Sequence, residues 1–211
     1  MIDFFLKDIE THFFREYPKE ACGILAVQKG KPKWFPCTNV AKENENFIID
    51  SNEYLKIHRT SDIIGIVHNH PDETSEASET DIAHCNTLGI LYGREYEFGV
   101  KDCFEAMRDY LKTVDINIPP RILFEDNWWT KKLDYFCPEI IKEWGGEEVS
   151  IKEIQKNDVI TFSVRSDVAN HCGIYLENDV FYHHAENRLS CRENLFPYWI
   201  QYIDRVYRYA A

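Results

Sequence analysis

The stretch IVHNHPDETSEASETD, residues 66–81, decides how the first half of the chain folds and what chemistry it can carry. It begins as the end of a buried strand and predicts a helix with an acidic first turn from Ser78 onward. Successive strand side chains point to opposite faces, so His68 and His70 share one face. Ser78 and Asp81 are three positions apart and share one face of the helix. The pattern brings two imidazoles and a carboxylate toward one point.

Two neutral imidazoles and one carboxylate are the ligand set of a catalytic zinc site with a fourth position left for water. Zinc lowers the pKa of that water toward 7, which makes hydroxide available at neutral pH. Such a site also needs a base, and Glu20 in YPKEACGIL lies between a predicted helix and a predicted strand. The alternative is a solvated polar loop that carries two surface histidines. Four fixed residues at fixed spacing favour the metal site.

These residues resemble the JAMM metalloprotease signature of deubiquitinating enzymes and their bacterial and viral relatives. The signature is a glutamate, then H-x-H, seven residues, serine, two residues and aspartate, and the P-x-E-x-C-G context at 18–23 is also similar. The resemblance implies that His68, His70 and Asp81 bind Zn²⁺. It further implies Glu20 as the general base, Ser78 as a group that helps stabilise the oxyanion, and cleavage of peptide or isopeptide bonds.

A second constellation begins at Cys103, the first residue of a predicted helix in DCFEAMRDYLKTV. A thiol at a helix N-terminus is near the positive end of the dipole, which favours the thiolate. HCGIYLENDVFYHH predicts a hairpin with a turn at 177–179 that places His171 opposite His183. These groups form a candidate nucleophile, base and orienting residue. A buried structural cysteine is the alternative, and His184 is a weaker candidate for the third position.

The D-C pair, the segment NHCGIYL and a histidine twelve residues after the first resemble NlpC-type cysteine peptidases, which cleave peptidoglycan stem peptides. The resemblance implies Cys103 as the nucleophile, His171 as the base and His183 as the third polar member. Tyr96 occupies roughly the place of the family's oxyanion tyrosine, although it is closer to the cysteine than is usual. Phe104 and Glu105 stand where a serine and a glycine often follow the cysteine.

The tandem order of the two modules resembles the tail assembly protein K family of long-tailed phages, over nearly the whole chain. This implies a tail-tip component or assembly factor whose partners are other phage tail-tip proteins and peptidoglycan stem peptides. Its peptidase chemistry would serve tail maturation, wall penetration or both. The implied locations are the host cytoplasm during assembly and the virion tail tip. The alternative is a structural tail-tip or scaffold protein whose sites bind without turnover.

The expected fold class is α+β in two small domains. Residues 1–92 are expected to form a JAMM-type sheet with flanking helices, and residues 93–211 an NlpC/papain-like helix with an antiparallel sheet. Residues 3–16 predict an amphipathic helix, with Phe4, Phe5, Ile9, Phe13 and Phe14 on one side. Two strands joined near Gly30 follow, and strands are expected in DVITFSV, HCGIYLEN, DVFYHHAE and IDRVYRY. The stretch 119–149 reads as irregular and then helical.

Composition narrows the possible partners. The chain has 24 Lys and Arg against 36 Asp and Glu, a formal net charge of −12. So acidic a protein is a poor candidate for binding nucleic-acid phosphates. The start MIDFFLKDIE lacks the pattern of a signal peptide, and the run IIGIV is far too short for a membrane span, so no membrane insertion is expected. Seven cysteines without a CxxC pair predict a reducing compartment.

Overall fold

The computed structural model describes residues 2–42, 47–71, 91–121, 125 and 127–209, and it divides into two compact units, Met1–Gly93 and Arg94–Ala211. Both units combine helices with antiparallel strands. The α+β class expected from the sequence is therefore confirmed. No helix in the described parts has the length and apolar character that crossing a bilayer requires.

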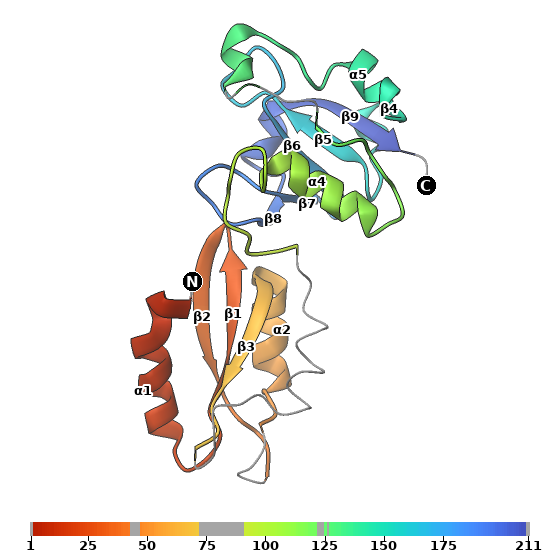
Figure 1. Ribbon diagram of the computed structural model, residues 1–211. Helices are drawn as coiled ribbons and strands as arrows, with labels where there is room; N and C mark the ends of the chain where they lie inside the picture. The colour runs from red at the N-terminus through yellow and green to blue at the C-terminus, as the bar shows by residue number, and fades with distance from the viewer. Residues whose placement is uncertain (1, 43–46, 72–90, 122–124, 126, 210–211) are drawn as a thin grey trace. The chain divides into compact units, whose positions relative to one another are not determined.

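A three-stranded antiparallel sheet is the centre of the first unit (Figure 1). Its order is β2-β1-β3, with β1 at Cys22–Gln28, β2 at Lys31–Cys37 and β3 at Asp62–His68. The two residues between β1 and β2, Lys29 and Gly30, both have positive φ, 52° and 71°. Two-residue turns of this kind match the twist of the flanking strands. The hairpin predicted around Gly30 is confirmed.

Two helices cover the sheet of the first unit. The helix α2 (Ser51–Thr60) is capped by Asp50, whose carboxylate accepts from the Asn52 and Glu53 amides at 2.9 and 3.1 Å. Its Ile57 packs with alternate residues of β1, Cys22, Ile24 and Ala26. The helix α1 (Leu6–Glu16) continues a 3₁₀ turn, η1 (Ile2–Phe5). It lies on the other face, where His12 meets the edge of the Trp34 ring.

The predicted apolar stripe of the first helix is confirmed only in part: Ile9 is buried and Phe5 and Phe13 are half-buried. Phe4 and Phe14 are 82% and 87% exposed, and the buried residues of α1 are Ile9 and His12. These two are three positions apart and share a face, whereas Phe14 is five positions from Ile9 and points away. His12 is held there by a 3.1 Å hydrogen bond between its Nε2 and the Cys22 carbonyl.

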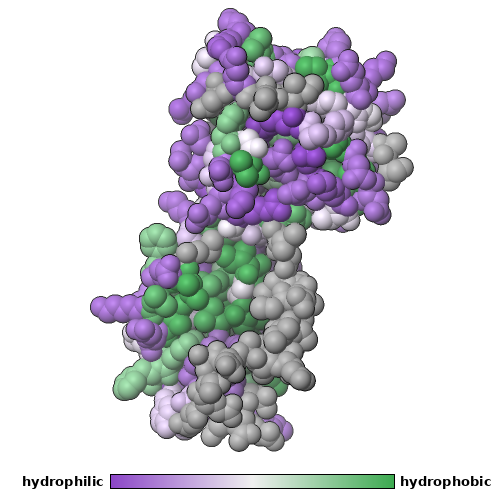
Figure 2. Space-filling view, in the orientation of Figure 1, coloured by the Kyte–Doolittle hydropathy of each residue, from purple (hydrophilic) through white to green (hydrophobic). Residues whose placement is uncertain are grey.

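Hydrophobic residues also gather on the surface of the first unit. Figure 2 shows them over the sheet of this unit. In agreement, every residue of β3 from Ile63 to His68 is only half-buried. The strand β3 therefore carries its apolar side chains and His68 at a partly exposed surface.

The second unit is built on a six-stranded antiparallel sheet of order β4-β9-β5-β6-β7-β8 (Figure 1). Its strands are β4 (Gly146–Val149), β5 (Val159–Phe162), β6 (His171–Glu177), β7 (Val180–His183), β8 (Cys191–Asn194) and β9 (Ile203–Tyr209). The helix α4 (Cys103–Lys112) packs against β6 and β7. Its buried residues include Cys103, Met107, Tyr110 and Leu111, which recur at the spacing of one helix face.

Shorter elements complete the second unit: η2 (Trp128–Lys131), α5 (Pro138–Glu143), η3 (Ile151–Glu153) and η4 (Trp199–Tyr202). The four strands predicted from sequence are β5, β6, β7 and β9. The strands β4 and β8 were not predicted, because GEEV and CREN are short and largely polar and show no apolar alternation. The failure to predict β8 matters, because this strand adds the Glu193 carboxylate to the site described next.

Candidate functional site

Cys103 occupies the first position of α4, and the residue before it fixes that helix end. The Asp102 carboxylate accepts from the Phe104 and Glu105 amides at 3.0 and 3.2 Å. Its second oxygen accepts from the Gly99 amide at 2.8 Å and from the Arg121 guanidinium at 2.6 Å. A side-chain cap of this kind satisfies amides that the helix leaves without partners. The thiol is thereby placed at the positive end of the helix dipole.

Arg121 balances the charge that the cap brings beside the thiol. Asp102 is 1% exposed and raises the pKa of Cys103 through its negative charge. The Arg121 guanidinium pairs with that carboxylate and lies over the rings of Phe98 and Phe104, 5.1 Å from each ring centre. A buried carboxylate needs such a partner to remain charged. The guanidinium charge of Arg121 therefore offsets part of the repulsion between the Asp102 carboxylate and a thiolate at Cys103.

The Cys103 thiol is acidic for a buried cysteine. Hydrogen bonding with the Cys172 thiol lowers its pKa most, burial opposes this, and the hydrogen bond and charge of His171 lower it further, to about 5. Burial, and then the neighbouring Cys103, raise the pKa of Cys172 well above its ordinary value. The Cys172 thiol therefore stays protonated and donates a hydrogen bond to the Cys103 sulfur. No sequence pattern assigned a role to Cys172, and this contact was not predicted.

His171 and His183 are joined by a 2.9 Å hydrogen bond between Nε2 of His171 and Nδ1 of His183. The predicted register is wrong in detail: Gly173, not His171, lies directly opposite His183. The two rings meet diagonally on the same face, two residues apart along β6. A Cβ at Gly173 would lie 2.8 Å from Phe181 Cδ2 and 3.1 Å from His183 Cβ. Glycine there leaves space for the diagonal contact.

Trp199 of η4 holds both rings. Its indole stacks on His171 with ring centres 5.3 Å apart and an interplanar angle of 29°. It meets His183 edge to face at 4.8 Å. Both histidines are buried, with 8% and 1% exposure. Aromatic packing on two sides restricts ring rotation, so the 2.9 Å contact is a fixed feature of the fold.

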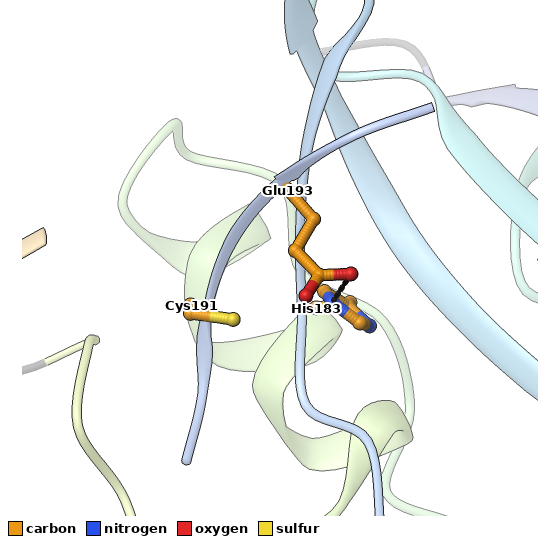
Figure 3. A group of neighbouring side chains, drawn as sticks. All are labelled: His183, Cys191 and Glu193. Carbon is orange, nitrogen blue, oxygen red and sulfur yellow. Dashed lines mark ion pairs between the residues drawn. The ribbon is translucent and has the colours of Figure 1, made fainter. Parts of the chain in front are cut away.

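On its other side, His183 faces a carboxylate from β8. His183 Nε2 lies 3.6 Å from Glu193 Oε2, and Figure 3 shows the carboxylate directed at the imidazole ring. Burial lowers the pKa of His183 to about 4, against the opposing effect of Glu193. Burial raises the pKa of Glu193, but hydrogen bonding to His183 and Trp199 outweighs it and brings that pKa to about 2. At neutral pH the pair is a neutral imidazole and a carboxylate.

Cys191 completes a group with these two residues (Figure 3), because ligand atoms of His183, Cys191 and Glu193 lie within 4.8 Å of one another. Such a group has the chemistry to bind a cation. Here, however, His183 Nδ1 is bonded to His171, and the Glu193 carboxylate already forms an ion pair with Arg188. The contacts present favour a hydrogen-bonded chain over a metal site.

Tyr96 and His184 lie together beside the thiol. Their rings meet edge to face with centres 5.4 Å apart. Burial raises the pKa of Tyr96, and the charges of Cys103 and Asp102 raise it further. Its phenol therefore stays protonated and able to donate. Burial also lowers the pKa of His184 to about 4. His183, not His184, contacts His171, while His184 packs against Tyr96.

In the first unit, His68 and His70 converge at the end of β3. Their Nε2 atoms are 3.0 Å apart, and the His68 ring stacks on Phe47 with centres 4.5 Å apart. Two nitrogens bound at about 2.0–2.1 Å to one tetrahedral ion lie about 3.3 Å apart. The separation and the imidazole donors fit a shared Zn²⁺. The other predicted members, Ser78 and Asp81, lie outside the described residues.

Glu20 is brought to the same end of the sheet. Cys22 pairs with His68, and Ala21 donates its amide to the Asn69 side chain at 2.7 Å while its carbonyl accepts from the Asn69 amide at 3.3 Å. Continuing this register places Glu20 opposite His70, and cross-strand partners share a face. Glu20 is 8% exposed, and its carbonyl accepts from the Asn39 side chain at 2.8 Å. Glu20 therefore lies just before β1, at the end of the sheet where β3 carries His68.

Comparison with known proteins agrees with this geometry. Residues 93–208, more than half of the chain, match the NlpC/P60 family. The chain belongs to the NlpC/P60 family. Residues 5–108 match prokaryotic homologues of the JAB domain. The NlpC/P60 unit of this chain therefore follows a segment similar to a second peptidase-type module, in the order that the sequence predicted.

Three relatives of this NlpC/P60 protein are informative. Tail tip assembly protein K of Escherichia phage N15 is 27% identical, over 95% of this chain and 92% of its own. Tail tip assembly protein K of Escherichia phage lambda is 26% identical, over 75% of this chain and 88% of its own. The CysO-cysteine peptidase of Mycobacterium tuberculosis H37Rv is 34% identical, over 34% of this chain and 55% of its own. The resemblance to the tail assembly protein K family is confirmed.

Sequence reasoning missed four contributors to the thiol site of this NlpC/P60 unit: Arg121, Cys172, Glu193 and Trp199. Cys172 directly follows His171 in the sequence, so of the four residues it was the easiest to predict near Cys103. Cys191 and Glu193 are two residues apart, and this alternation would have placed both on one strand face. The positions of Arg121 and Trp199 depend on loops whose course no local pattern predicts.

The acidic thiol gives a direct prediction for alkylation by iodoacetamide. Only the thiolate reacts, so the rate at Cys103, followed by peptide mass spectrometry between pH 4 and 9, is expected to reach half its maximum near pH 5. Cys172→Ala removes the hydrogen bond that lowers the Cys103 pKa most, so it is expected to raise the pH midpoint of Cys103 alkylation. Cys137→Ala, which alters a cysteine at the start of α5, serves as the control. A wild-type midpoint near the ordinary value of 9 would contradict the described thiol environment.

Proposed function

We propose that this protein is a phage tail-tip assembly protein with two peptidase modules. Residues 93–211 act as a thiol peptidase that cleaves peptidoglycan stem peptides, and residues 1–92 as a zinc-dependent peptidase or isopeptidase. The observation that carries the proposal is the acidic Cys103 thiol at a helix N-terminus, beside a buried His171–His183 hydrogen bond. That arrangement supplies a nucleophile, a base and a residue that orients the base.

In the thiol module, Nδ1 of His171 takes the proton of Cys103, whose pKa of about 5 leaves the sulfur as a thiolate at neutral pH, and this thiolate attacks the carbonyl carbon of the scissile amide. Nε2 of His171 remains bonded to His183, which keeps Nδ1 directed at the reacting atoms. His171 then protonates the departing amine, leaving a thioester on Cys103. Water, deprotonated by His171, hydrolyses the thioester and regenerates the thiol. The Tyr96 phenol, protonated at neutral pH, is the proposed donor to the oxyanion.

In the first module, His68, His70 and Asp81 are the proposed ligands of one Zn²⁺, which would supply Lewis acidity and an acidic water ligand. Glu20 is the proposed general base, and its position opposite His70 supports that role. Ser78 is the proposed donor to the oxyanion. The two imidazole nitrogens of the described pair, 3.0 Å apart, support the ligand assignment.

The proposed tail role follows from the relatives, two of which are named tail tip assembly protein K and match most of this chain. The partners would then be other tail-tip proteins and the stem peptides of peptidoglycan. The protein would act in the host cytoplasm during assembly, and in the virion tail tip if it remains there. No nucleic-acid partner is proposed, because the chain carries a net charge of −12.

Digestion of purified peptidoglycan tests the thiol module. Wild-type protein is expected to release new amino groups and shortened stem peptides, separated by liquid chromatography and identified by mass spectrometry. Cys103→Ala removes the nucleophile and is expected to lower the rate by at least about 10³-fold. Cys137→Ala, a half-buried cysteine without a proposed role, is expected to retain wild-type activity. Identical profiles for wild type and Cys103→Ala would instead favour a structural tail-tip protein.

Metal analysis tests the first module. Wild-type protein purified in the presence of zinc and then desalted is expected to retain close to one Zn²⁺ per chain by mass spectrometry of the metal. His68→Ala removes one of the two imidazoles that meet at the end of β3, so it is expected to lose most of that zinc. His58→Ala on α2 is the control and is expected to retain it. If wild type and His68→Ala bind no zinc, the metallopeptidase assignment fails.

A further inference from the structure

Glu193 forms the far end of a continuous chain of polar contacts that begins at the candidate nucleophile. Its Oε2 accepts from the Trp199 indole N–H at 2.6 Å and lies 3.6 Å from His183 Nε2. Its Oε1 pairs with the Arg188 guanidinium. Figure 3 shows this carboxylate projecting from β8 toward the imidazole on β7. The side chain is 12% exposed, so the contacts lie largely out of water.

We propose that Glu193 is a positioning residue of the thiol site, acting through His183 on His171 as the fourth member of the chain Cys103–His171–His183–Glu193. The role in catalysis rests on the proposed thiol-peptidase function. The positioning itself is a property of the folded protein and can be tested without a substrate. The proposal assigns a task to a carboxylate that the three-residue arrangement leaves unused.

The first task of Glu193 is to select a tautomer. A carboxylate accepts hydrogen bonds and carries negative charge, so at 3.6 Å from His183 Nε2, a contact slightly longer than a hydrogen bond, it favours the tautomer with the proton on that nitrogen. In a neutral ring Nδ1 is then an acceptor, and it accepts from Nε2–H of His171 across 2.9 Å. A neutral His171 protonated on Nε2 has its lone pair on Nδ1. Each ring thereby determines the tautomer of the next. Nδ1 of His171 is then the nitrogen that can receive a proton from the Cys103 thiol.

The second task is to balance charge. When Cys103 gives its proton to His171, the imidazolium is buried and its other neighbour, His183, is neutral. The thiolate is one counter-charge, but it is consumed when sulfur attacks the substrate. Glu193 provides a second, placed beyond His183 on the same line of contacts. Glu193 does not contact His171 and therefore acts through His183, whose hydrogen bond to His171 transmits the polarisation along the chain.

A purely structural role is the competing explanation, because Glu193 also forms an ion pair with Arg188. The two explanations separate when either partner is replaced. Arg188→Gln breaks the ion pair but leaves the carboxylate beside His183, and Arg188 itself lowers the pKa of His183. Glu193→Gln breaks the same ion pair and removes the negative charge. A structural bridge predicts similar effects for both variants, whereas positioning predicts effects of opposite sign on the thiol.

The test measures the pH midpoint of Cys103 alkylation in the full-length protein and in its variants. Glu193→Gln is expected to raise the midpoint by about one pH unit, because the imidazolium that stabilises the thiolate loses its counter-charge. Arg188→Gln is expected to leave the midpoint in place or lower it. Glu193→Asp keeps a negative charge in the site and is expected to recover most of the shift. Equal midpoints in wild type and Glu193→Gln, or equal upward shifts in Glu193→Gln and Arg188→Gln, would overturn the proposal.

Peptidoglycan digestion supplies a second readout. If the thiol module is active, the kcat/KM of Glu193→Gln is expected to be about tenfold lower than that of wild type at pH values below the wild-type alkylation midpoint. The difference between the two is expected to shrink as the pH rises above that midpoint. A loss that is the same at every pH would indicate a structural role and overturn the proposal. If wild type cleaves no peptidoglycan, the proposed function fails, while the alkylation midpoints still decide the role of Glu193. If Glu193→Gln does not fold, Glu193→Ala, which also removes the negative charge, takes its place and is expected to raise the midpoint by a similar amount, and a wild-type midpoint in that variant would overturn the proposal.

Discussion

The hydrogen bond between His171 and His183 is the interaction on which the rest of the thiol site depends. It joins two buried rings from neighbouring strands, and it forms diagonally because Gly173 leaves the space opposite His183 free. Both rings pack on Trp199. Without this bond, a base beside Cys103 would be free to rotate and to adopt either tautomer. With it, the sheet determines which nitrogen faces the thiol.

Charged and hydrogen-bonding groups from three separate elements, α4, β6 and β8, surround the thiol and the two histidines. The N-terminus of α4 and the Arg121–Asp102 pair set the field at the sulfur. The Cys172 thiol from β6 donates to it. The strand β8 adds Glu193 at the opposite end, where Trp199 and Arg188 hold the carboxylate. Burial alone would raise the pKa of the Cys103 thiol, and the hydrogen bond from Cys172 and the contact with His171 lower it instead.

Local sequence patterns predicted much of this architecture and part of the site. The strand containing HCGIYLE, the helix that begins at Cys103 and the hairpin at Gly30 each carry a clear periodicity or turn signal, and all three are present. The register that pairs His183 with Gly173 was not predicted, because it depends on an irregularity near Glu177. Glu193 was missed because CREN lacks the apolar alternation of a strand. The stripe on α1 was predicted in part: Ile9 is buried, but Phe4 and Phe14 are exposed because tertiary packing selects the face that carries Ile9 and His12.

The ring nitrogens of His183 provide the most direct test of the central claim that a fixed chain of tautomers orients the base. Long-range ¹H–¹⁵N correlation spectra of ¹⁵N-labelled protein at pH 7 distinguish protonated from unprotonated imidazole nitrogens. The structure predicts a neutral His183 that is protonated on Nε2 and accepts at Nδ1, as its position between His171 and Glu193 requires. A His183 protonated on Nδ1, or one that exchanges between the two tautomers, would contradict the account.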